Sequence, residues 1–280
     1  MATGATEFID VTTADVFLEE KWSKTATIAR DAELAFMKYG CDRQFEGELA
    51  KGQILRIQNI SDLAARAKSA NTAISYETVT ETEATITINQ FYYSAYAMED
   101  VIKPMVEMSK IDAYSKKLGY ALGLSEDAYI AAFVDDGTLN TVGTLATPLT
   151  YANLLRADQY LNDANAPQEN RLIIISPAEK ANFLGMDEFI NGDYAQIQGK
   201  TLVGSWMNYP VYVSTHVEGS NAAGHDNFIG HKDCIAQITQ IQPIVKSFYD
   251  LDYFCVKMAA LTTYAGTIRR ADHGVWAKGG

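Results

Sequence analysis

Residues 61–84 cannot add much to a compact core, because Ala, Ser, Thr and charged side chains dominate them. They lie between two stretches with the alternating pattern of half-buried β-strands, residues 53–60 and residues 85–89. The sequence therefore predicts two strands joined by a long polar excursion. Connections of this length are uncommon in compact domains and are usually functional or disordered.

The charges around this excursion are divided between its two legs. Bases predominate between residues 49 and 76, and all charges between 77 and 84 are acidic. The residues concerned are Lys51, Arg56, Arg66 and Lys68 on the first leg, and Glu77, Glu81 and Glu83 on the second. One interpretation is cross-strand pairing within a hairpin, at about 0.2–1 kcal/mol per pair. The other is a projecting hairpin that meets complementary charge on another subunit.

A single long helix is predicted from about residue 104 to residue 134, because apolar or small side chains recur there at helical spacing. At ~1.5 Å per residue it would be roughly 45 Å long. Gly119 and Gly123 lie in its middle. Each costs about 1 kcal/mol relative to Ala in a helix interior, and we interpret them as a close contact or a bend.

The chain on either side of these features is less regular. Residues 1–45 are typical of an extended arm that carries a helix. After residue 147 the pattern alternates between helix and strand. We expect a helix at 150–164, a buried strand at 171–175, a helix with Ser176 and Glu179 as a capping box, a hairpin at 201–216, a loop at 217–227, mostly short strands in 228–270 and a free tail at 279–280.

No motif points to catalysis, to a metal or to a cofactor. Residues 192–201 resemble a phosphate-binding loop only superficially, because six residues separate the two glycines where that loop needs four. Several His and Asp residues lack metal-ligand spacing, and we interpret them as polar loop and strand-edge residues. They are His216, His225, Asp226, His231 and Asp233.

Charge and hydropathy exclude some classes of protein. The 280 residues carry 23 basic and 35 acidic side chains, a net charge of −12. A protein that wraps nucleic acid neutralises phosphates with Lys and Arg, so this charge argues against that class. No apolar run approaches ~18 residues, and we expect no membrane span. The first residues lack a basic and an apolar region, so no signal peptide is expected.

Several stretches, in this order, resemble the major capsid protein of tailed bacteriophages, which has the HK97-like fold. An acidic residue and Trp-Ser open the arm helix in that family, as Glu20 and Trp22-Ser23 do here, although Glu19 stands where the family usually has Pro. The matching stretches are residues 17–23, 45–57, 74–77 with 85–92, 165–177 and 204–214.

The resemblance implies an α+β fold with five parts. These are an N-terminal arm (1–45), an extended β-hairpin loop (46–96), a peripheral domain with a long spine helix (97–139), an α/β axial domain (140–235), and peripheral return strands with a C-terminal tail (236–280).

It also implies a structural protein and no enzyme. Pentamers and hexamers would form an icosahedral shell around double-stranded DNA, in a virion assembled in the host cytoplasm. The implied partners are the chain itself, a separate scaffolding protein, a portal and, in some members, decoration proteins. No cofactor and no membrane are implied.

On this reading the assembly-interface residues are Trp22, Lys51, Arg56, Arg66, Lys68, Glu77, Glu81 and Glu83, and the spine-helix hinge is Gly119 with Gly123. Two alternatives stay open. The first is an encapsulin-like compartment, which shares the fold and encloses protein cargo. The second is a soluble α/β enzyme or ligand-binding protein, for which no convergent polar site is visible.

Overall fold

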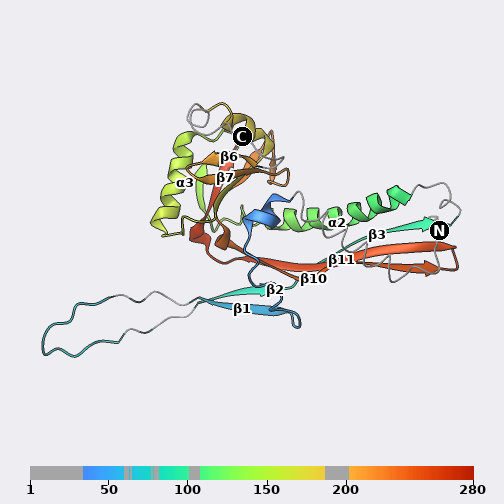
Figure 1. Cartoon of the computed structure of the whole chain (residues 1–280). Helices are drawn as coiled ribbons and strands as arrows, with labels where there is room; N and C mark the ends of the chain where they lie inside the picture. The colour runs from blue at the N-terminus through green and yellow to red at the C-terminus, as the bar shows by residue number, and fades with distance from the viewer. Residues whose placement is uncertain are drawn as a thin grey trace.

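The computed structural model describes residues 34–59, 63, 65–76, 78, 82–100, 108–186 and 202–280. Figure 1 shows a rounded α/β unit, a long flat layer of sheet and helix, and a thin projecting loop. The predicted arm motif with Trp22, the acidic residues Glu77 and Glu81, and residues 192–201 lie outside the described residues.

The rounded unit is built on a seven-stranded mixed sheet. Its strand order is β4-β12-β9-β5-β7-β6, with β8 beside β9. The strands are β4 (Asn140–Gly143), β5 (Arg171–Ile175), β6 (Leu202–Trp206), β7 (Tyr209–Val213), β8 (Gly219–Ser220), β9 (Gly224–His231) and β12 (Gly274–Gly279). Every residue of β5 is buried, which confirms the apolar strand predicted at 171–175. The predicted loop at 217–227 is partly wrong, since it contains β8 and the start of β9.

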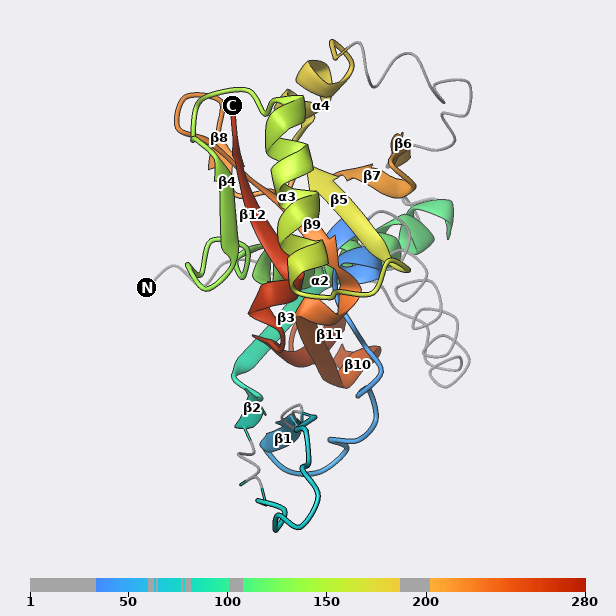
Figure 2. The same ribbon diagram turned by 90° about the vertical axis from the view of Figure 1, so that its left-hand side faces the viewer.

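Two helices accompany this sheet, as the sequence predicted. They are α3 (Tyr151–Asp163) and α4 (Pro177–Phe183). The apolar side of α3, with Leu154 and Leu161, packs on one face of the sheet against Ile173 and Ile175 (Figure 2). The other face, with Ile174, meets the short helical turn η1 (Phe36–Gly40) and the end of the long helix.

The capping box is half confirmed. The Ser176 hydroxyl accepts the Glu179 N–H at 3.1 Å, as an N-cap should. The Glu179 carboxylate does not return to the Ser176 N–H, which instead donates to Asn227 Oδ1 at 2.8 Å. Asn227 of β9 thus accepts the hydrogen bond that the capping box assigns to Glu179.

The flat layer is a three-stranded sheet with one helix on it. β10 (Ile235–Asp250), β11 (Cys255–Ile268) and β3 (Gln90–Glu99) pair antiparallel in that order, and α2 (Met108–Ala131) runs along them. Leu118 and Leu122 of α2 pack on Val245, Met258 and Ala260. This confirms the predicted long helix. The expectation of short strands after residue 228 is wrong for β10 and β11. The pairing of these strands shifts register between Thr239 and Ile244. This shift breaks the alternation of apolar and polar residues by which a long strand is recognised in a sequence.

The predicted hairpin is confirmed. β1 (Ile54–Asn59) pairs antiparallel with β2 (Thr82–Thr87), and Arg56 stands opposite Thr85. Ile57 and Ile86 pack against the inner part of β10 and β11, through Ile238 and Ala265. Figure 1 shows this hairpin on the side of the long strands opposite α2, with residues 65–76 extending away from the body.

The last strand corrects the expectation for residues 236–280. β12 does not return to the peripheral layer and residues 279–280 are not a free tail. β12 pairs with β9 and β4 inside the seven-stranded sheet. A Cβ on Gly279 would collide with the Glu179 carboxylate, so a larger residue there would displace this side chain.

Candidate assembly surfaces

The extended loop offers a basic and apolar groove. The two legs of residues 63–76 face one another, and Leu63, Ile74 and Tyr76 line the space between them together with Arg66 and Lys68. All five are exposed. The Arg66 guanidinium donates to Ser75 Oγ at 3.2 Å, which links the legs. Exposed apolar side chains beside bases are typical of a surface that meets another protein.

Among the residues that the structure describes, one of the predicted charge pairs is formed between Arg56 and Glu83. Arg56 Nη1 lies 3.4 Å from Glu83 Oε1, and these side chains are 67% and 50% exposed. Such an exposed pair contributes about 0–1 kcal/mol. Arg56 therefore has a partner in its own hairpin, as the first interpretation of these charges expected, while Lys51 is exposed at the start of the hairpin.

The second candidate surface is the outer face of the three-stranded sheet, opposite α2. Ile244, Leu261 and Tyr93 are cross-strand neighbours that form one row across the sheet. They are 50%, 45% and 76% exposed, and Phe91 and Phe248 beside them are exposed as well. In the next row, Val245 and Ala260 are buried under α2. Strand alternation has thus placed one apolar row on each face, and α2 covers only one of them.

Sequence reasoning missed this outer face, because a strand pattern shows which side chains share a face and not whether another element covers it.

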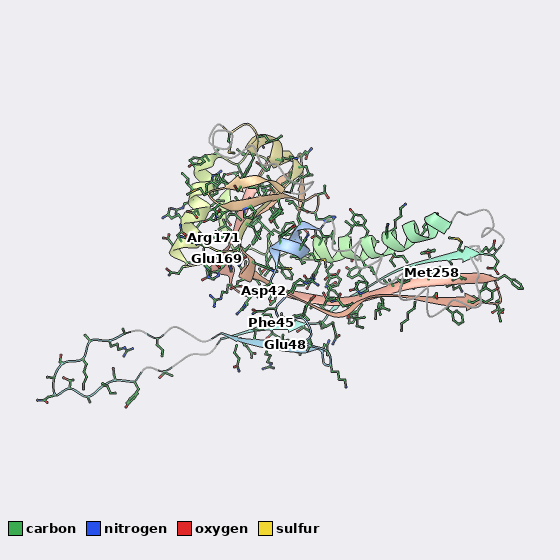
Figure 3. All side chains as sticks on the ribbon, in the orientation of Figure 1. Asp42, Phe45, Glu48, Glu169, Arg171 and Met258 are labelled. Carbon is green, nitrogen blue, oxygen red and sulfur yellow. The ribbon has the colours of Figure 1, made fainter. Side chains whose placement is uncertain are left out.

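Figure 3 shows Met258 between the long strands and α2, and Asp42 where the hairpin joins the body. Asp42 lies 3.6 Å from the Arg269 guanidinium, and that guanidinium lies over the Phe45 ring. These contacts hold the base of the hairpin against β11.

The spine helix carries two buried acids near its end. Glu126 and Asp127 have no exposed surface. Glu126 Oε1 accepts hydrogen bonds from Gln237 Nε2 and from the Thr239 hydroxyl of β10. Acidic side chains of a helix usually face the solvent, and these two do not. Their partners lie more than 85 residues away, so no local pattern announces them.

The predicted hinge residues lie within one continuous helix. Gly119 and Gly123 are both buried in α2, which has no break between Met108 and Ala131. The bend therefore stays a prediction about another state of the molecule. Cys41 packs in the core beside Ile130, near the end of α2, and its thiol donates a hydrogen bond to Gln237 Oε1. Burial raises the pKa of this thiol to about 12.

Two groups of side chains have the composition of a cation site. One is His231, Asp233 and His273, and the other is the acidic trio Asp135, Glu218 and Asp226. Desolvation raises the pKa values of Glu218 and Asp226, and the charge of Asp135 raises both further. Within the described ranges, no helix has both the length and the apolar character needed to cross a bilayer.

A family model described as phage capsid protein matches residues 47–209, more than half of the chain. A comparison with curated proteins found no match. The fold is similar to that of a solved structure of Mycobacterium phage Che8, at 20% identity and a TM-score of 0.71 over 88% of this chain and 91% of that one.

Two further solved structures share this fold. The capsid structure of the Cyanophage P-SCSP1u is 16% identical, with a TM-score of 0.67 over 88% of each chain. The capsid of a native GTA particle is 12% identical, with a TM-score of 0.64 over 99% of this chain and 94% of that one.

Proposed function

The chain belongs to the phage capsid protein family and has the HK97-like fold, and we propose that it assembles as pentamers and hexamers into an icosahedral shell around double-stranded DNA. Its role as a structural capsid protein follows from the family. The shell geometry and the contents are the proposal.

The observation that carries this proposal is the outer face of the three-stranded sheet. Ile244, Leu261 and Tyr93 expose a row of apolar surface that no described part of the chain covers. Contiguous apolar patches on soluble proteins mark interaction surfaces. Together with the projecting groove of residues 63–76, this face makes the subunit incomplete by itself.

The net charge supports a container that does not bind its DNA tightly. At −12 the subunit repels the phosphate backbone, so packaged duplex can move along the inner wall. We propose no sequence-specific contact with DNA. The expected partners are further copies of the chain, a separate scaffolding protein, a portal and, where the shell carries them, decoration proteins, in a virion assembled in the host cytoplasm.

Electron microscopy of the purified protein tests the function. Closed icosahedral particles that protect double-stranded DNA from nuclease would support it. Particles filled with protein would instead support the encapsulin-like compartment. A stable compact monomer under all assembly conditions would contradict both and return the chain to the soluble α/β class.

Two variants test the proposed loop residues. Reversing Arg56, Arg66 and Lys68 to Glu should block assembly if they meet acidic groups on a neighbouring subunit. The matched control is Arg56→Glu with Glu83→Arg, which keeps the pair within the hairpin and inverts the charge shown to a neighbour. Normal particles from the triple variant would refute the role of these bases in assembly. If only the variant with Arg56→Glu and Glu83→Arg forms normal particles, Arg56 acts only within its own hairpin.

A further inference from the structure

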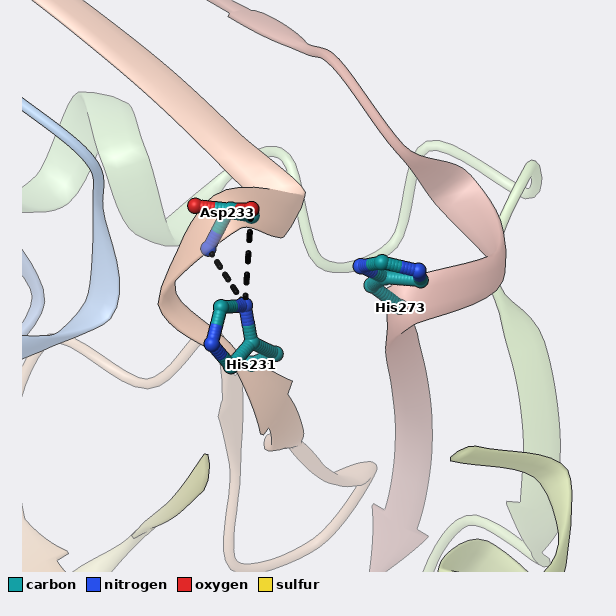
Figure 4. A group of neighbouring side chains, drawn as sticks. All are labelled: His231, Asp233 and His273. Atoms are coloured by element: carbon teal, nitrogen blue, oxygen red, sulfur yellow. Dashed lines mark hydrogen bonds and ion pairs between the residues drawn. The ribbon is translucent and has the colours of Figure 1, made fainter. Parts of the chain in front are cut away.

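The chain passes between the seven-stranded sheet and the three-stranded sheet at two neighbouring crossings. The first is the turn η4 (Lys232–Cys234), which joins β9 to β10. The second is the turn η5 (Ala271–His273), which joins β11 to β12, and the two turns are in contact. His231 and Asp233 lie on the first crossing and His273 on the second, and Figure 4 shows all three side by side.

The two residues of the first crossing are already oriented. His231 Nδ1 accepts the Asp233 N–H at 3.1 Å, and Asp233 Oδ2 lies 3.9 Å from the same nitrogen. Because Nδ1 accepts this N–H, it carries a lone pair on the side that faces Asp233.

The residue of the second crossing has an unmet hydrogen-bonding capacity. His273 is 2% exposed, and its Nδ1 has no hydrogen-bond partner among the described residues. A buried polar atom in this state costs about 1–3 kcal/mol. Its ring stands edge-on to the His231 ring, with centroids 6.0 Å apart. One ligand atom from each of the three residues lies within 4.8 Å of the others.

We propose that His231, Asp233 and His273 bind a divalent transition metal ion of the zinc class. Two imidazole nitrogens and one carboxylate oxygen form a ligand set that such ions prefer and that Mg²⁺ and Ca²⁺ do not. A water molecule would take the fourth position. The ion would give the buried His273 ring a polar partner.

Binding requires a small closure of the site. Zinc–ligand distances of about 2.0–2.2 Å bring the ligand atoms of a tetrahedral site to roughly 3.3–3.6 Å from one another, so these atoms must approach by on the order of 1 Å. Asp233, whose side chain is 33% exposed, can rotate toward the rings. The metal would replace the hydrogen bond from the Asp233 N–H to His231 Nδ1.

The charges around the site do not oppose a cation. The two imidazole rings lie in the electrostatic field of three carboxylates and two guanidinium groups. The carboxylates belong to Asp42, Asp233 and Asp272, and the guanidinium groups to Arg171 and Arg270. Arg171 is itself paired with Asp158 at 3.2 Å. Burial lowers the pKa of both histidines, and neutral imidazole is the form that binds metal. A bound ion would tie the two crossings together and fix how the two sheets meet.

The test uses the full chain, freed of metal with a chelator and titrated at neutral pH with Zn²⁺ alone, and with Co²⁺ as a spectroscopic probe. We expect saturable binding of one ion per chain, a visible Co²⁺ absorption typical of tetrahedral nitrogen and oxygen ligands, and a thermal midpoint that rises with Zn²⁺ concentration. His273→Gln should weaken binding by about tenfold or more.

Asp233→Asn keeps the shape of a partly exposed side chain. This variant should therefore have an unchanged melting temperature in the absence of metal, while its affinity for Zn²⁺ should be lower. His225→Gln is the matched control, because His225 is a buried histidine of β9 with its own partner, Asn221 Oδ1 at 3.1 Å. The absence of saturable binding by the unmodified chain would overturn the proposal. So would equal affinity in His273→Gln and the unmodified chain, or an equal loss in His225→Gln.

Discussion

Nδ1 of His216 lies 2.6 Å from Oδ2 of Asp127, a residue 89 positions away in the sequence. The other oxygen of the same carboxylate accepts the Met37 N–H at 2.9 Å. One buried side chain of α2 thus joins the spine helix to η1 and to the segment that follows β7. Because a buried carboxylate is stable only when its partners are in place, this contact ties the layers to a single arrangement.

Removing this carboxylate should destabilise the fold. Asp127→Ala leaves the Met37 N–H and the His216 ring without their partner, and we expect a loss of about 2–4 kcal/mol in the free energy of unfolding. Asp127→Asn keeps an acceptor and should cost less. Urea unfolding midpoints measure both, with the exposed Asp136→Ala as the control. Equal midpoints for Asp127→Ala and the control would contradict this account.

Glu179 should hold the strand β12 in place. Its buried carboxylate accepts the Gly280 N–H at 2.5 Å and the Leu149 N–H at 3.3 Å. Glu179→Ala should cost about 2–4 kcal/mol, since two backbone donors lose a charged acceptor. Glu179→Gln should cost less.

Hydrogen exchange of the β12 amides locates the effect of Glu179→Ala. Faster exchange in β12 than in β5 is expected, because the Gly280 N–H that loses its acceptor directly follows β12. If the amides of both strands exchange at the same new rate, the carboxylate acts on the whole sheet and not on β12.

If the proposed shell expands after assembly, the hinge predicted at Gly119 and Gly123 should set the rate of that expansion. Ala at Gly119 and Gly123 stiffens the helix, since each glycine costs about 1 kcal/mol of helix stability. We therefore expect slower expansion of assembled particles, measured by time-resolved small-angle scattering. Ala121→Gly, at an exposed position of the same helix, is the reciprocal control and should speed expansion. If the doubly substituted particles mature at the unmodified rate, the hinge hypothesis is lost.

The acidic trio should make stability depend on pH. Burial and then the charges of Asp135 and Asp226 raise the pKa of Glu218. The folded chain therefore holds this proton more firmly than the unfolded chain, and stability falls as the pH rises through the ordinary carboxyl range to the raised pKa.

Glu218→Gln removes this effect. It should raise the melting temperature at neutral pH, and the gain should shrink near about pH 4, where the carboxyl is protonated in both states. Asp163→Asn, an exposed acid of α3, is the control for the loss of one charge. A gain of the same size at both pH values would show that the shifted pKa is not its cause.

The elements with a regular local pattern could be predicted from the sequence. Ile57 and Ile86 alternate with polar residues and mark β1 and β2, and the apolar stripe of α2 gave its course to within a few residues. The N-cap of α4 at Ser176 could be predicted because an N-cap depends only on the residues that follow it in the sequence. The family resemblance includes the segments of β1 and β2 and the start of α4, together with the order of the matching stretches.

The tertiary structure alone decided which of these elements meet and which surfaces stay open. The burial of Asp127, the place of β12 beside β9, the meeting of His231 with His273 and the uncovered row of Ile244, Leu261 and Tyr93 all depend on partners from distant parts of the chain. The periods of a strand or helix state which side chains share a face. They do not state what lies opposite that face, because this is fixed only when the whole chain has packed and its long-range hydrogen bonds have formed.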